Sequence, residues 1–317
     1  MGKRKVCVLV GATASGKTSI GVRIAKELNG EIISADSMQI YQLMNIGTAK
    51  PSLSEQDGVP HHLIDCVPPD RAYSVAQFVD DAEAKINNIF DRGKTPIIVG
   101  GTGLYINGLT LPWGFQGESK NKDVRTELET LADQKGNQFL YEELKKVDPN
   151  AAEIIHPNNV KRVIRALEIY QVTGKTKTQW DAEAQEIPTE YDYRLAGLMW
   201  DRSVLYDRID HRVDQMMKDG LLDEIKMLTA KGYGEECQSM KALGYKEFFP
   251  YLKGEIDLDE TVRILKRDTR HFAKRQLTWF RKDERIRWFD CASFDDQSSL
   301  CQAIIDYYEI NKKYMEK

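Results

Sequence analysis

The stretch KVCVLVGATASGKTSIGVRIAKEL, residues 5–28, decides the fold of this chain. Its first part, residues 6–10, is a short β-branched run closed by glycine, which is typical of a buried parallel strand. Its last part repeats apolar residues at Ile20, Ile24 and Leu28, which predicts a helix with one apolar face. A glycine-framed loop that ends in lysine and threonine joins the two. The stretch therefore predicts a strand, a loop and a helix in direct succession.

The loop has the pattern G-x-x-x-x-G-K-[ST], which is the phosphate-binding loop or P-loop. It consists of Gly11, Ala12, Thr13, Ala14, Ser15, Gly16, Lys17 and Thr18. The backbone N–H groups of such a loop and the positive end of the following helix form a cradle for a di- or triphosphate, such as that of a nucleotide. Lys17 adds a positive charge, and the Thr18 hydroxyl can bind Mg²⁺. An ordinary glycine-rich turn is the alternative, but such a turn does not require all the fixed positions together.

The composition excludes several classes of protein. The chain has 317 residues, of which 41% are hydrophobic, and this is enough for one large domain with an insertion or for two domains. Its five cysteines are scattered without a C-x-x-C pair, which argues against a disulfide framework or a zinc site. No apolar run approaches bilayer length, and no signal-peptide core precedes the first strand. We therefore expect a cytoplasmic protein without a membrane segment.

Two further predicted strands end in residues that can do chemistry. The strand at residues 31–35 delivers Asp36 to the edge of the sheet that carries the P-loop, because ligands of open parallel sheets lie at the carboxyl ends of the strands. This carboxylate can be a Mg²⁺ ligand, a general base or the N-cap of the next turn. The strand at residues 95–99 ends in Gly-Gly-Thr, with Thr102 where a typical P-loop hydrolase has its Mg²⁺-binding Asp. These glycines either let the backbone approach a ligand closely or form a tight turn.

The middle of the chain lacks buried strands. From about residue 119 to residue 191 it has charged segments with helical apolar spacing, and an apolar strand returns at residues 193–200. We therefore expect an α/β fold, with a P-loop NTPase-like parallel sheet flanked by helices in residues 1–118 and 192–317. Residues 119–191 are expected to form an all-helical insertion domain.

Positive charge is concentrated on one predicted helix near the C-terminus, although the net charge of the chain is −4. Between residues 261 and 282, eight Lys and Arg residues accompany a single acid, Asp268. Such a basic face, with His271 and Trp279 nearby, favours binding of nucleic acid. A merely solvated charged face is the alternative.

Two other pairs of residues leave more than one interpretation. Arg208 and Arg212 share a helix face at i, i+4, so they can hold phosphate oxygens or form ion pairs with the acids at positions 207 and 210. The adjacent His61 and His62 have no third metal ligand at a suitable spacing, and this favours structural histidines over a metal site.

Taken in order, these motifs closely resemble those of the tRNA dimethylallyltransferase (isopentenyltransferase) family. The segments that carry the resemblance are GATASGKT at 11–18, DSMQIY at 36–41, IGTAKP at 46–51, HHLID at 61–65, GGTGLY at 100–105 and AKRQLTWFR at 273–281. They extend from the first strand almost to the C-terminus, and together they are highly specific. The chain departs from the family at Ala12, where Pro is more frequent, and this changes nothing in the chemistry.

The resemblance implies transfer of a dimethylallyl group from dimethylallyl diphosphate to N6 of adenosine 37, next to the anticodon of tRNA. The implied catalytic residues are Asp36, Lys17, Thr102 and Arg208. The implied diphosphate-binding residues are those of the P-loop together with Arg212. Of the two arginines, Arg212 is the weaker choice. Asp36 takes the proton of the attacking amine, and Thr18 binds Mg²⁺. Because diphosphate leaves from carbon, no phosphoryl-transfer machinery is needed, which explains the missing strand-end Asp.

The resemblance also implies contacts with the anticodon stem-loop, whose adenine must leave its stack to react. The implied residues are Asp36, Ser37, Met38, Gln39, Thr102, Arg125, Asn159, Val160, Lys161, Arg162, Val163, Lys241, Gly244, Tyr245, Lys246, Lys274, Arg275, Gln276, Thr278, Trp279 and Arg281. We expect the enzyme to act as a monomer.

Two other functions share some of these features. A nucleotide or nucleoside kinase would use the same P-loop, with Asp36 as the base for a hydroxyl group. A non-catalytic RNA-binding protein could retain the phosphate site and the basic helix without any reaction.

Overall fold

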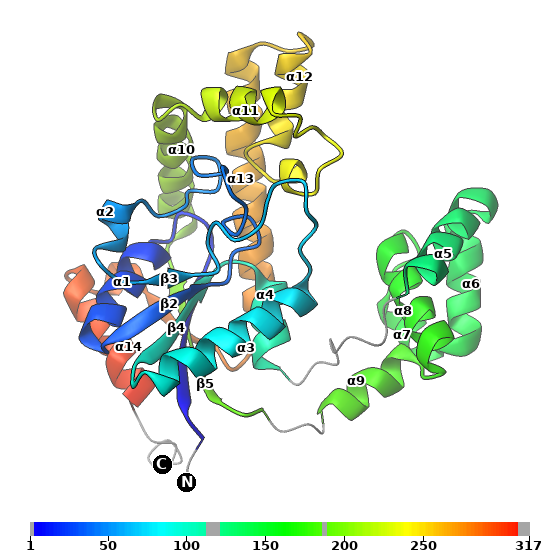
Figure 1. The fold of residues 1–317 in the computed structure, drawn as a ribbon, viewed down its shortest axis with the longest axis horizontal. Helices are drawn as coiled ribbons and strands as arrows, with labels where there is room; N and C mark the ends of the chain where they lie inside the picture. Colours follow the sequence, from blue (N-terminus) through cyan, green and yellow to red (C-terminus); the bar gives the residue numbers. More distant parts are fainter. Residues whose placement is uncertain (1–2, 112–120, 186–188, 310–317) are drawn as a thin grey trace. The chain divides into compact units, whose positions relative to one another are not determined.

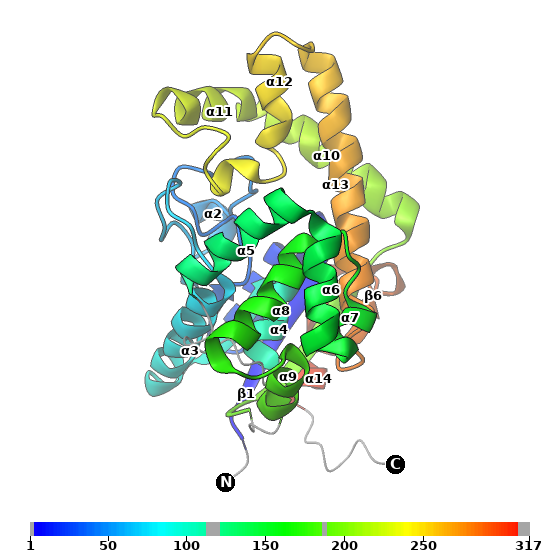
Figure 2. The same ribbon diagram turned by 90° about the vertical axis from the view of Figure 1, so that its right-hand side faces the viewer.

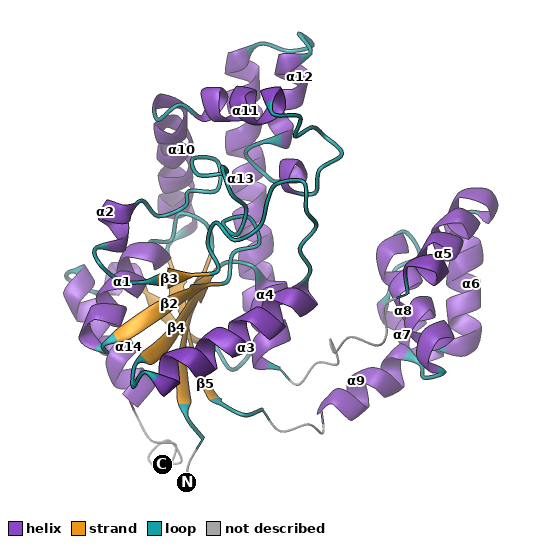
Figure 3. Cartoon of the chain, in the orientation of Figure 1, coloured by secondary structure: helices purple, strands orange, loops and turns teal. Residues whose placement is uncertain are grey.

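A six-stranded parallel sheet forms the centre of the larger of two compact units (Figures 1 and 3). The computed structural model describes residues 3–111, 121–185 and 189–309. The strands follow the order β3-β2-β4-β1-β5-β6. Their bounds are β1 (Lys5–Gly11), β2 (Gly30–Ser34), β3 (His61–His62), β4 (Thr95–Gly100), β5 (Asp192–Met199) and β6 (Arg287–Asp290). Every neighbouring pair is parallel, so all carboxyl ends lie at one edge, and the predicted α/β fold class is confirmed.

The central strand β1 is buried on both faces, which explains its uninterrupted apolar sequence. Cys7 and Leu9 belong to a core cluster with α1 (Lys17–Glu27) and α14 (Gln297–Glu309). On the other face of the sheet lies α3 (Val75–Asp91), whose N-cap, Ser74, forms a complete capping box with Gln77 (Figure 1).

Helices from the last third of the chain gather beyond the carboxyl edge of the sheet (Figures 1 and 2). They are α10 (Arg202–Lys218), α11 (Leu221–Ala230), α12 (Phe249–Leu252) and α13 (Leu258–Phe280), with the short turns η2 (Ser239–Lys241) and η3 (Lys246–Phe248) between them. Leu205 and Ile209 of α10 and Ala273 of α13 pack against the P-loop alanines. The P-loop therefore has an apolar support on α10 and α13. Three further short elements occur elsewhere in the chain: α2 (Leu53–Gln56), α4 (Gly103–Thr110) and η4 (Cys291–Ser293).

A second compact unit consists of helices alone. The chain divides into residues 1–106 with 190–317, and residues 107–189. The helices after α4 in the second unit are α5 (Lys122–Lys135), α6 (Asn137–Val147), α7 (Pro149–Ile154), α8 (Val160–Thr173) and α9 (Lys177–Gln185). Leu128, Leu144 and Leu167 are among the residues of its own core. The unit begins at residue 107, inside α4, whereas the sequence placed the boundary at 118–119, which lies outside the described residues. In the described part of the chain, no helix is both long and apolar enough to cross a bilayer.

The glycines that follow β4 are required by packing within the protein. A Cβ atom on Gly100 would lie 2.2 Å from the carbonyl oxygen of Ala35 at the end of β2. A Cβ on Gly101 would lie 2.4 Å from Gln276 Nε2 of α13, and one on Gly103 would lie 2.3 Å from the indole ring of Trp279. The sequence allowed either a close approach to a ligand or a tight turn, whereas these glycines let β2, β4 and α13 approach one another.

We expect Gly100→Ala to lower the free energy of unfolding by about 1–3 kcal/mol, as overpacking of an interior typically does. The new methyl group would meet a backbone carbonyl of β2, which cannot rotate away as a side chain can. Chemical denaturation of the variant and the wild type measures this difference. An unchanged unfolding free energy would show that the ends of β2 and β4 lie farther apart than described.

Candidate active site

The P-loop turns from β1 into α1 without a side chain that caps the helix. Gly16 occupies the N-cap position with φ of 92°, and Ala14 also has a positive φ, 61°. Because Gly16 offers no side-chain acceptor, the first N–H groups of α1 remain available to an anion. Lys17 Nζ donates a hydrogen bond to the carbonyl oxygen of Ala12 at 2.7 Å, and this holds its ammonium group across the loop.

Two side chains hold the carbonyl oxygens of the P-loop. Trp200 Nε1 donates to the carbonyl oxygen of Ser15 at 2.9 Å. Arg208 Nε donates to the carbonyl oxygen of Ala14 at 2.8 Å, and its guanidinium carbon lies 4.7 Å from the centre of the Trp200 ring. The carbonyl side of the loop is therefore fixed by residues that follow β5.

Gln276 of α13 connects the P-loop to the segment after β4. Its Oε1 accepts the backbone N–H of Thr13 at 2.8 Å, and its Nε2 donates to the carbonyl oxygen of Gly101 at 2.9 Å. The residue is only 8% exposed. Both ends of the amide are thus used to position two loops at the carboxyl edge of the sheet.

Asp36 begins a turn directly after β2. Its Oδ1 accepts the backbone N–H groups of Met38 at 2.9 Å and Gln39 at 3.4 Å, so the carboxylate does cap this turn. These bonds use one carboxylate oxygen and leave the other for chemistry. Thr102 Oγ1 accepts the backbone N–H of Ser37 at 3.0 Å, so the threonine lies beside the same turn.

Two cavities meet at the P-loop. An inner cavity of about 280 Å³ is lined by Thr13, Lys17 and Thr18, by the turn at residues 36–39, by Thr102 and by α10 and α13. An outer cavity of about 1260 Å³ is lined by residues 16–19, 49–53 and the outward side of α10, including Arg208 and Arg212. The residues common to both are Lys17, Thr18, Arg212 and Met216. A molecule in the inner cavity can therefore contact the P-loop, Asp36 and α13 at once.

Part of the inner cavity is apolar. Ile209 and Val213 of α10 and Leu265 and Phe272 of α13 contribute to its lining. This lining suits a short apolar group attached to a phosphate that the P-loop binds.

The charges of the inner cavity are arranged for an anion. Burial, and next the neighbouring Arg212 charge, lower the pKa of Lys17 to about 8, while Asp36 acts in the opposite direction. Burial also lowers the pKa of Arg212, again against the effect of Asp36. Two cations share a poorly hydrated place, so an anionic ligand that pairs with them relieves their mutual repulsion.

Comparison with known proteins identifies the family. A family model described as IPP transferase matches residues 39–283, and one described as isopentenyl transferase matches residues 4–71. This chain belongs to the IPP transferase family.

Relatives and solved structures match over nearly the whole chain. A tRNA dimethylallyltransferase from Alkaliphilus oremlandii is 49% identical over 303 residues, which is 96% of each protein. One from Halalkalibacterium halodurans is 50% identical over 300 residues, which is 95% of each. The crystal structure of a tRNA isopentenylpyrophosphate transferase from Bacillus halodurans aligns with a TM-score of 0.73 at 45% identity, over 99% of this chain and 100% of that one. A eukaryotic dimethylallyltransferase acting on tRNA aligns with a TM-score of 0.82 at 32% identity, over 95% of this chain and 78% of that one.

The two arginines of α10 in this IPP transferase have different surroundings. Arg212 lines both cavities, whereas Arg208 lines only the outer one and gives its Nε to the P-loop. Neither forms an ion pair with an acid in the described residues, and Asp210 pairs with Arg270 instead, at 2.6 Å. The resemblance ranked Arg208 first; Arg212 lines the cavity that Lys17 and Asp36 share, and which of the two arginines contacts a diphosphate stays a prediction.

The basic face of α13 is smaller than its sequence indicates. Its N-terminal half is neutralised by the pairs Arg263–Glu260, Lys266–Asp214, Arg267–Asp268 and Arg270–Asp210. Two of the acids come from α10, which a count of charges along α13 could not reveal. Lys274, Arg275, Arg281 and Lys282 are exposed, and none has an ion pair within the part of the chain that is described.

Four residues that the resemblance assigned to tRNA are buried. Gln276 is committed to the P-loop, Tyr245 is 0% exposed, Gly244 is buried next to Gly47, and Val163 lies in the core of the helical unit. Gly244 and Gln276 nevertheless line the inner cavity, so contact of these four positions with RNA stays a prediction.

The remaining predicted positions are accessible to differing degrees. Asn159, Lys161, Arg162, Lys241, Lys246, Lys274, Arg275, Thr278 and Arg281 are exposed, whereas Ser37, Met38, Gln39, Thr102, Val160 and Trp279 are partly buried. Arg125 pairs with the buried Glu168 at 3.3 Å and keeps 43% of its side chain exposed. Direct contact of these residues with RNA stays a prediction.

The residues fit a Mg²⁺ ion that is held mainly by the ligand. Thr18 and Asp36 lie in the inner cavity, but the described residues contain no cluster of three His, Cys, Asp or Glu side chains that could form a metal cage. Mg²⁺ commonly binds through one or two protein oxygens together with substrate phosphates. His61 and His62 bond instead to Val59 and to the buried Glu31, as expected for structural histidines.

Some residues that build the site carry no signal in the sequence. Glu224 of α11 accepts three successive backbone N–H groups, and Trp200 holds the P-loop. Lys50 was recognised only as part of a motif, although its side chain is 5% exposed and organises the loop before α2.

We expect the affinity for an alkyl diphosphate to fall as the pH rises above about 8, the pKa of Lys17 in the free protein. The bound anion favours the charged lysine. Below about pH 8 the lysine of the free protein already carries the required proton. Above about pH 8 the lysine must take up a proton when the ligand binds, so the affinity falls by up to about tenfold per pH unit. The ligand itself contributes little in this range, because its last pKa is about 6. Calorimetric titrations between pH 7 and 9.5 measure the slope, and Lys17→Met should remove it. A flat wild-type profile contradicts the assignment.

Proposed function

We propose that this enzyme transfers the dimethylallyl group of dimethylallyl diphosphate to N6 of adenosine 37, beside the anticodon of tRNA, and releases diphosphate. The observation that carries the proposal is the inner cavity, which brings Asp36, Lys17, Arg212 and an apolar lining together between the P-loop and α13. The proposal agrees with the names of the relatives, which are tRNA dimethylallyltransferases.

The reaction needs one proton transfer and one leaving group. The N6 nitrogen attacks C1 of the dimethylallyl group, a C–N bond forms, and the C1–O bond to diphosphate breaks. Asp36 accepts the proton that the amine loses. Lys17, the P-loop N–H groups, Arg208 and Arg212 stabilise the negative charge that develops on the leaving diphosphate.

Mg²⁺ is part of the proposal, with the Thr18 hydroxyl as its protein ligand. When bound, it would neutralise charge on the diphosphate oxygens. The Thr102 hydroxyl, which accepts the N–H of Ser37, would fix the turn that carries Asp36 relative to the substrate amine.

The tRNA surface is proposed to include the C-terminal half of α13. Lys274, Arg275 and Arg281 are exposed there, and Phe272 and Gln276 of the same helix line the inner cavity. An adenine that leaves its stack beside α13 could thus enter the cavity. We further propose that the exposed Lys161 and Arg162 of the helical unit contact the anticodon stem, and that the enzyme is a cytoplasmic monomer.

A kinase is the less favoured function. β4 ends at Gly100 and is followed by Gly101 and Thr102, so the described structure has no acid at the strand end where a P-loop phosphoryl transferase holds its metal. The apolar lining of the inner cavity also suits a prenyl group better than a sugar hydroxyl.

The direct test is incubation of the enzyme with Mg²⁺, dimethylallyl diphosphate and an unmodified anticodon stem-loop. Mass spectrometry of the digested RNA should show one five-carbon unit on one adenosine. Phosphate transfer from ATP without prenyl transfer would favour the kinase, and RNA binding without either reaction would favour a binding protein.

We expect Asp36→Asn to lower kcat by about 10²- to 10⁴-fold, the usual contribution of a general base. Binding of the stem-loop should change much less, because the amide keeps the shape of the carboxylate. Single-turnover rates and filter binding separate the two effects. A variant that transfers the prenyl group at the wild-type rate would remove Asp36 from the role of base.

We expect the double change Lys274→Gln, Arg275→Gln to weaken tRNA binding and to reduce the slope of log K against log salt by about one for each phosphate that the protein no longer neutralises. Arg263→Gln, Arg267→Gln is the matched control, because it removes the same charge from the same helix at positions that are already paired with acids. Equal effects of the two double variants would show that the C-terminal half of α13 has no special contact with RNA.

A further inference from the structure

Residues 45–50, here called the 45–50 loop, form a wall between the two cavities. Gly47 and Thr48 line the inner cavity, whereas Asn45, Ile46, Ala49 and Lys50 line the outer one. The position of this single loop therefore affects the shape of both cavities, and Lys17 of the P-loop lines both.

A buried anion holds the N–H groups of the loop. Glu224 of α11, which is 8% exposed, accepts the backbone N–H groups of Asn45 and Ile46 through Oε2, both at 2.8 Å. Its Oε1 accepts the backbone N–H of Gly47 at 3.1 Å and the hydroxyl of Tyr245 at 2.8 Å. Three successive N–H groups form a small anion-binding concavity, and the protein fills it with its own carboxylate.

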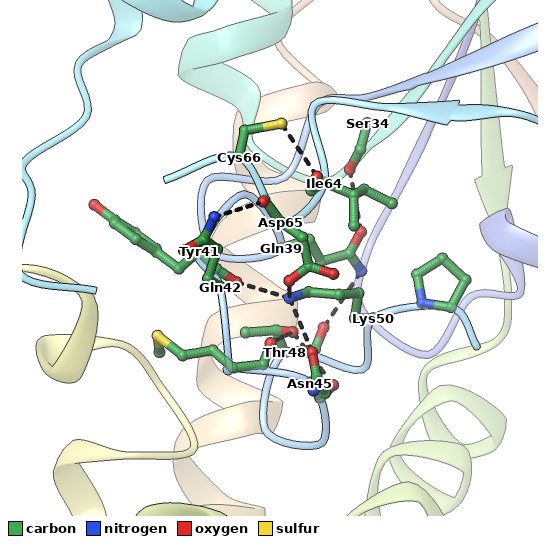
Figure 4. A network of polar contacts seen from close by, with 12 residues as sticks. Ser34, Gln39, Tyr41, Gln42, Asn45, Thr48, Lys50, Ile64, Asp65 and Cys66 are labelled. Carbon is green, nitrogen blue, oxygen red and sulfur yellow. Dashed lines mark hydrogen bonds and ion pairs between the residues drawn. The ribbon is translucent and has the colours of Figure 1, made fainter. Parts of the chain in front are cut away.

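A buried cation holds oxygen atoms of the same region. Lys50 Nζ donates to the carbonyl oxygen of Tyr41 at 2.7 Å and to Asn45 Oδ1 at 3.0 Å, and it pairs with Asp65 (Figure 4). The loop is thus fixed at its N–H groups by Glu224 and at its other end by Lys50. Charge-assisted hydrogen bonds of this kind are stronger than neutral ones.

The loop is connected to the turn of Asp36 through one side chain. Gln39 Nε2 donates to the carbonyl oxygens of Thr48 at 3.3 Å and Ala49 at 3.1 Å, as Figure 4 shows for Thr48. The backbone N–H of the same residue donates to Asp36 Oδ1. Gln39 therefore connects the loop to the carboxylate of Asp36 by hydrogen bonds.

The aromatic ring of Tyr245 packs against the 45–50 loop at Gly47. A Cβ atom on Gly47 would lie 2.5 Å from this ring, so only glycine lets the loop approach it. Removal of the Glu224 carboxylate would leave three loop N–H groups and a buried tyrosine hydroxyl without their acceptor.

We infer that Glu224 is a positioning residue of the reaction: it holds the 45–50 loop as the wall of the inner cavity and, through Gln39, orients Asp36. The kinetic part of this inference rests on the proposed prenyl transfer. The structural part, protection of three N–H groups by one carboxylate, does not depend on it.

The test compares Glu224→Gln with Asp223→Asn. Asp223 is exposed on the same first turn of α11, so the control removes the same charge from the same place in the helix without touching the loop. Hydrogen exchange should be slow at residues 45–47 in the wild type and the control, and fast in Glu224→Gln. We expect kcat of Glu224→Gln to fall by about 10- to 100-fold, as small misplacements of catalytic groups do, while alkyl diphosphate affinity changes less than about twofold.

Tyr245→Phe serves as a milder variant in case Glu224→Gln does not fold. It keeps the ring against Gly47 and removes one of the four hydrogen bonds, so kcat should fall in the same direction by a smaller factor. Rapid exchange at residues 45–47 in the wild type would overturn the inference. So would equal kcat in Glu224→Gln and the control, or a parallel loss of kcat, diphosphate affinity and thermal stability. If the wild type fails to transfer a prenyl group at all, the proposed function fails. The exchange data then still test whether Glu224 protects the N–H groups of residues 45–47.

Discussion

The N–H groups at the start of α1 must stay free for an anion while the rest of the P-loop backbone stays fixed, and the whole site depends on how this is achieved. Besides Lys17 of the loop itself, side chains from outside the loop satisfy this constraint. Trp200 and Arg208 bind its carbonyl oxygens, and Gln276 ties one N–H to the segment after β4. These side chains come from segments that follow β5, so the site is complete within the unit of residues 1–106 and 190–317 although the helical unit interrupts the sequence.

The fixed loop places charges that do not neutralise one another. Lys17 and Arg212 line the same inner cavity, and burial lowers the pKa of each. In the proposed reaction, a diphosphate that binds there meets charges whose positions are already set, and the same charges stabilise it when it leaves from carbon. Asp36 is close enough to affect both cations, so the proposed base lies in the same electrostatic environment as the proposed diphosphate site.

The sequence predicted the parts of the site that are local. The apolar run before Gly11 and the complete P-loop pattern were sufficient for the strand, loop and helix, and the rule on strand ends placed Asp36 and Thr102 beside them. Prediction from the sequence failed for residues whose contacts are made by side chains far away along the chain. Gly101 and Gly103 are explained by side chains of α13, and the lysines and arginines of α13 are neutralised partly by acids of α10. Glu224 lies in an unremarkable amphipathic helix, and no spacing connects it with residues 45–47.

The central claim is that base, diphosphate and purine meet in one cavity at the carboxyl edge of the sheet. The most direct measurement is a crystal structure of the enzyme with an anticodon stem-loop and a non-reactive analogue of dimethylallyl diphosphate. We expect the diphosphate on Lys17 and the P-loop, and the N6 atom of the extruded adenine within about 3 Å of the Asp36 carboxylate. An adenine that stays stacked in the RNA, or one that lies in the outer cavity away from Asp36, would contradict this claim.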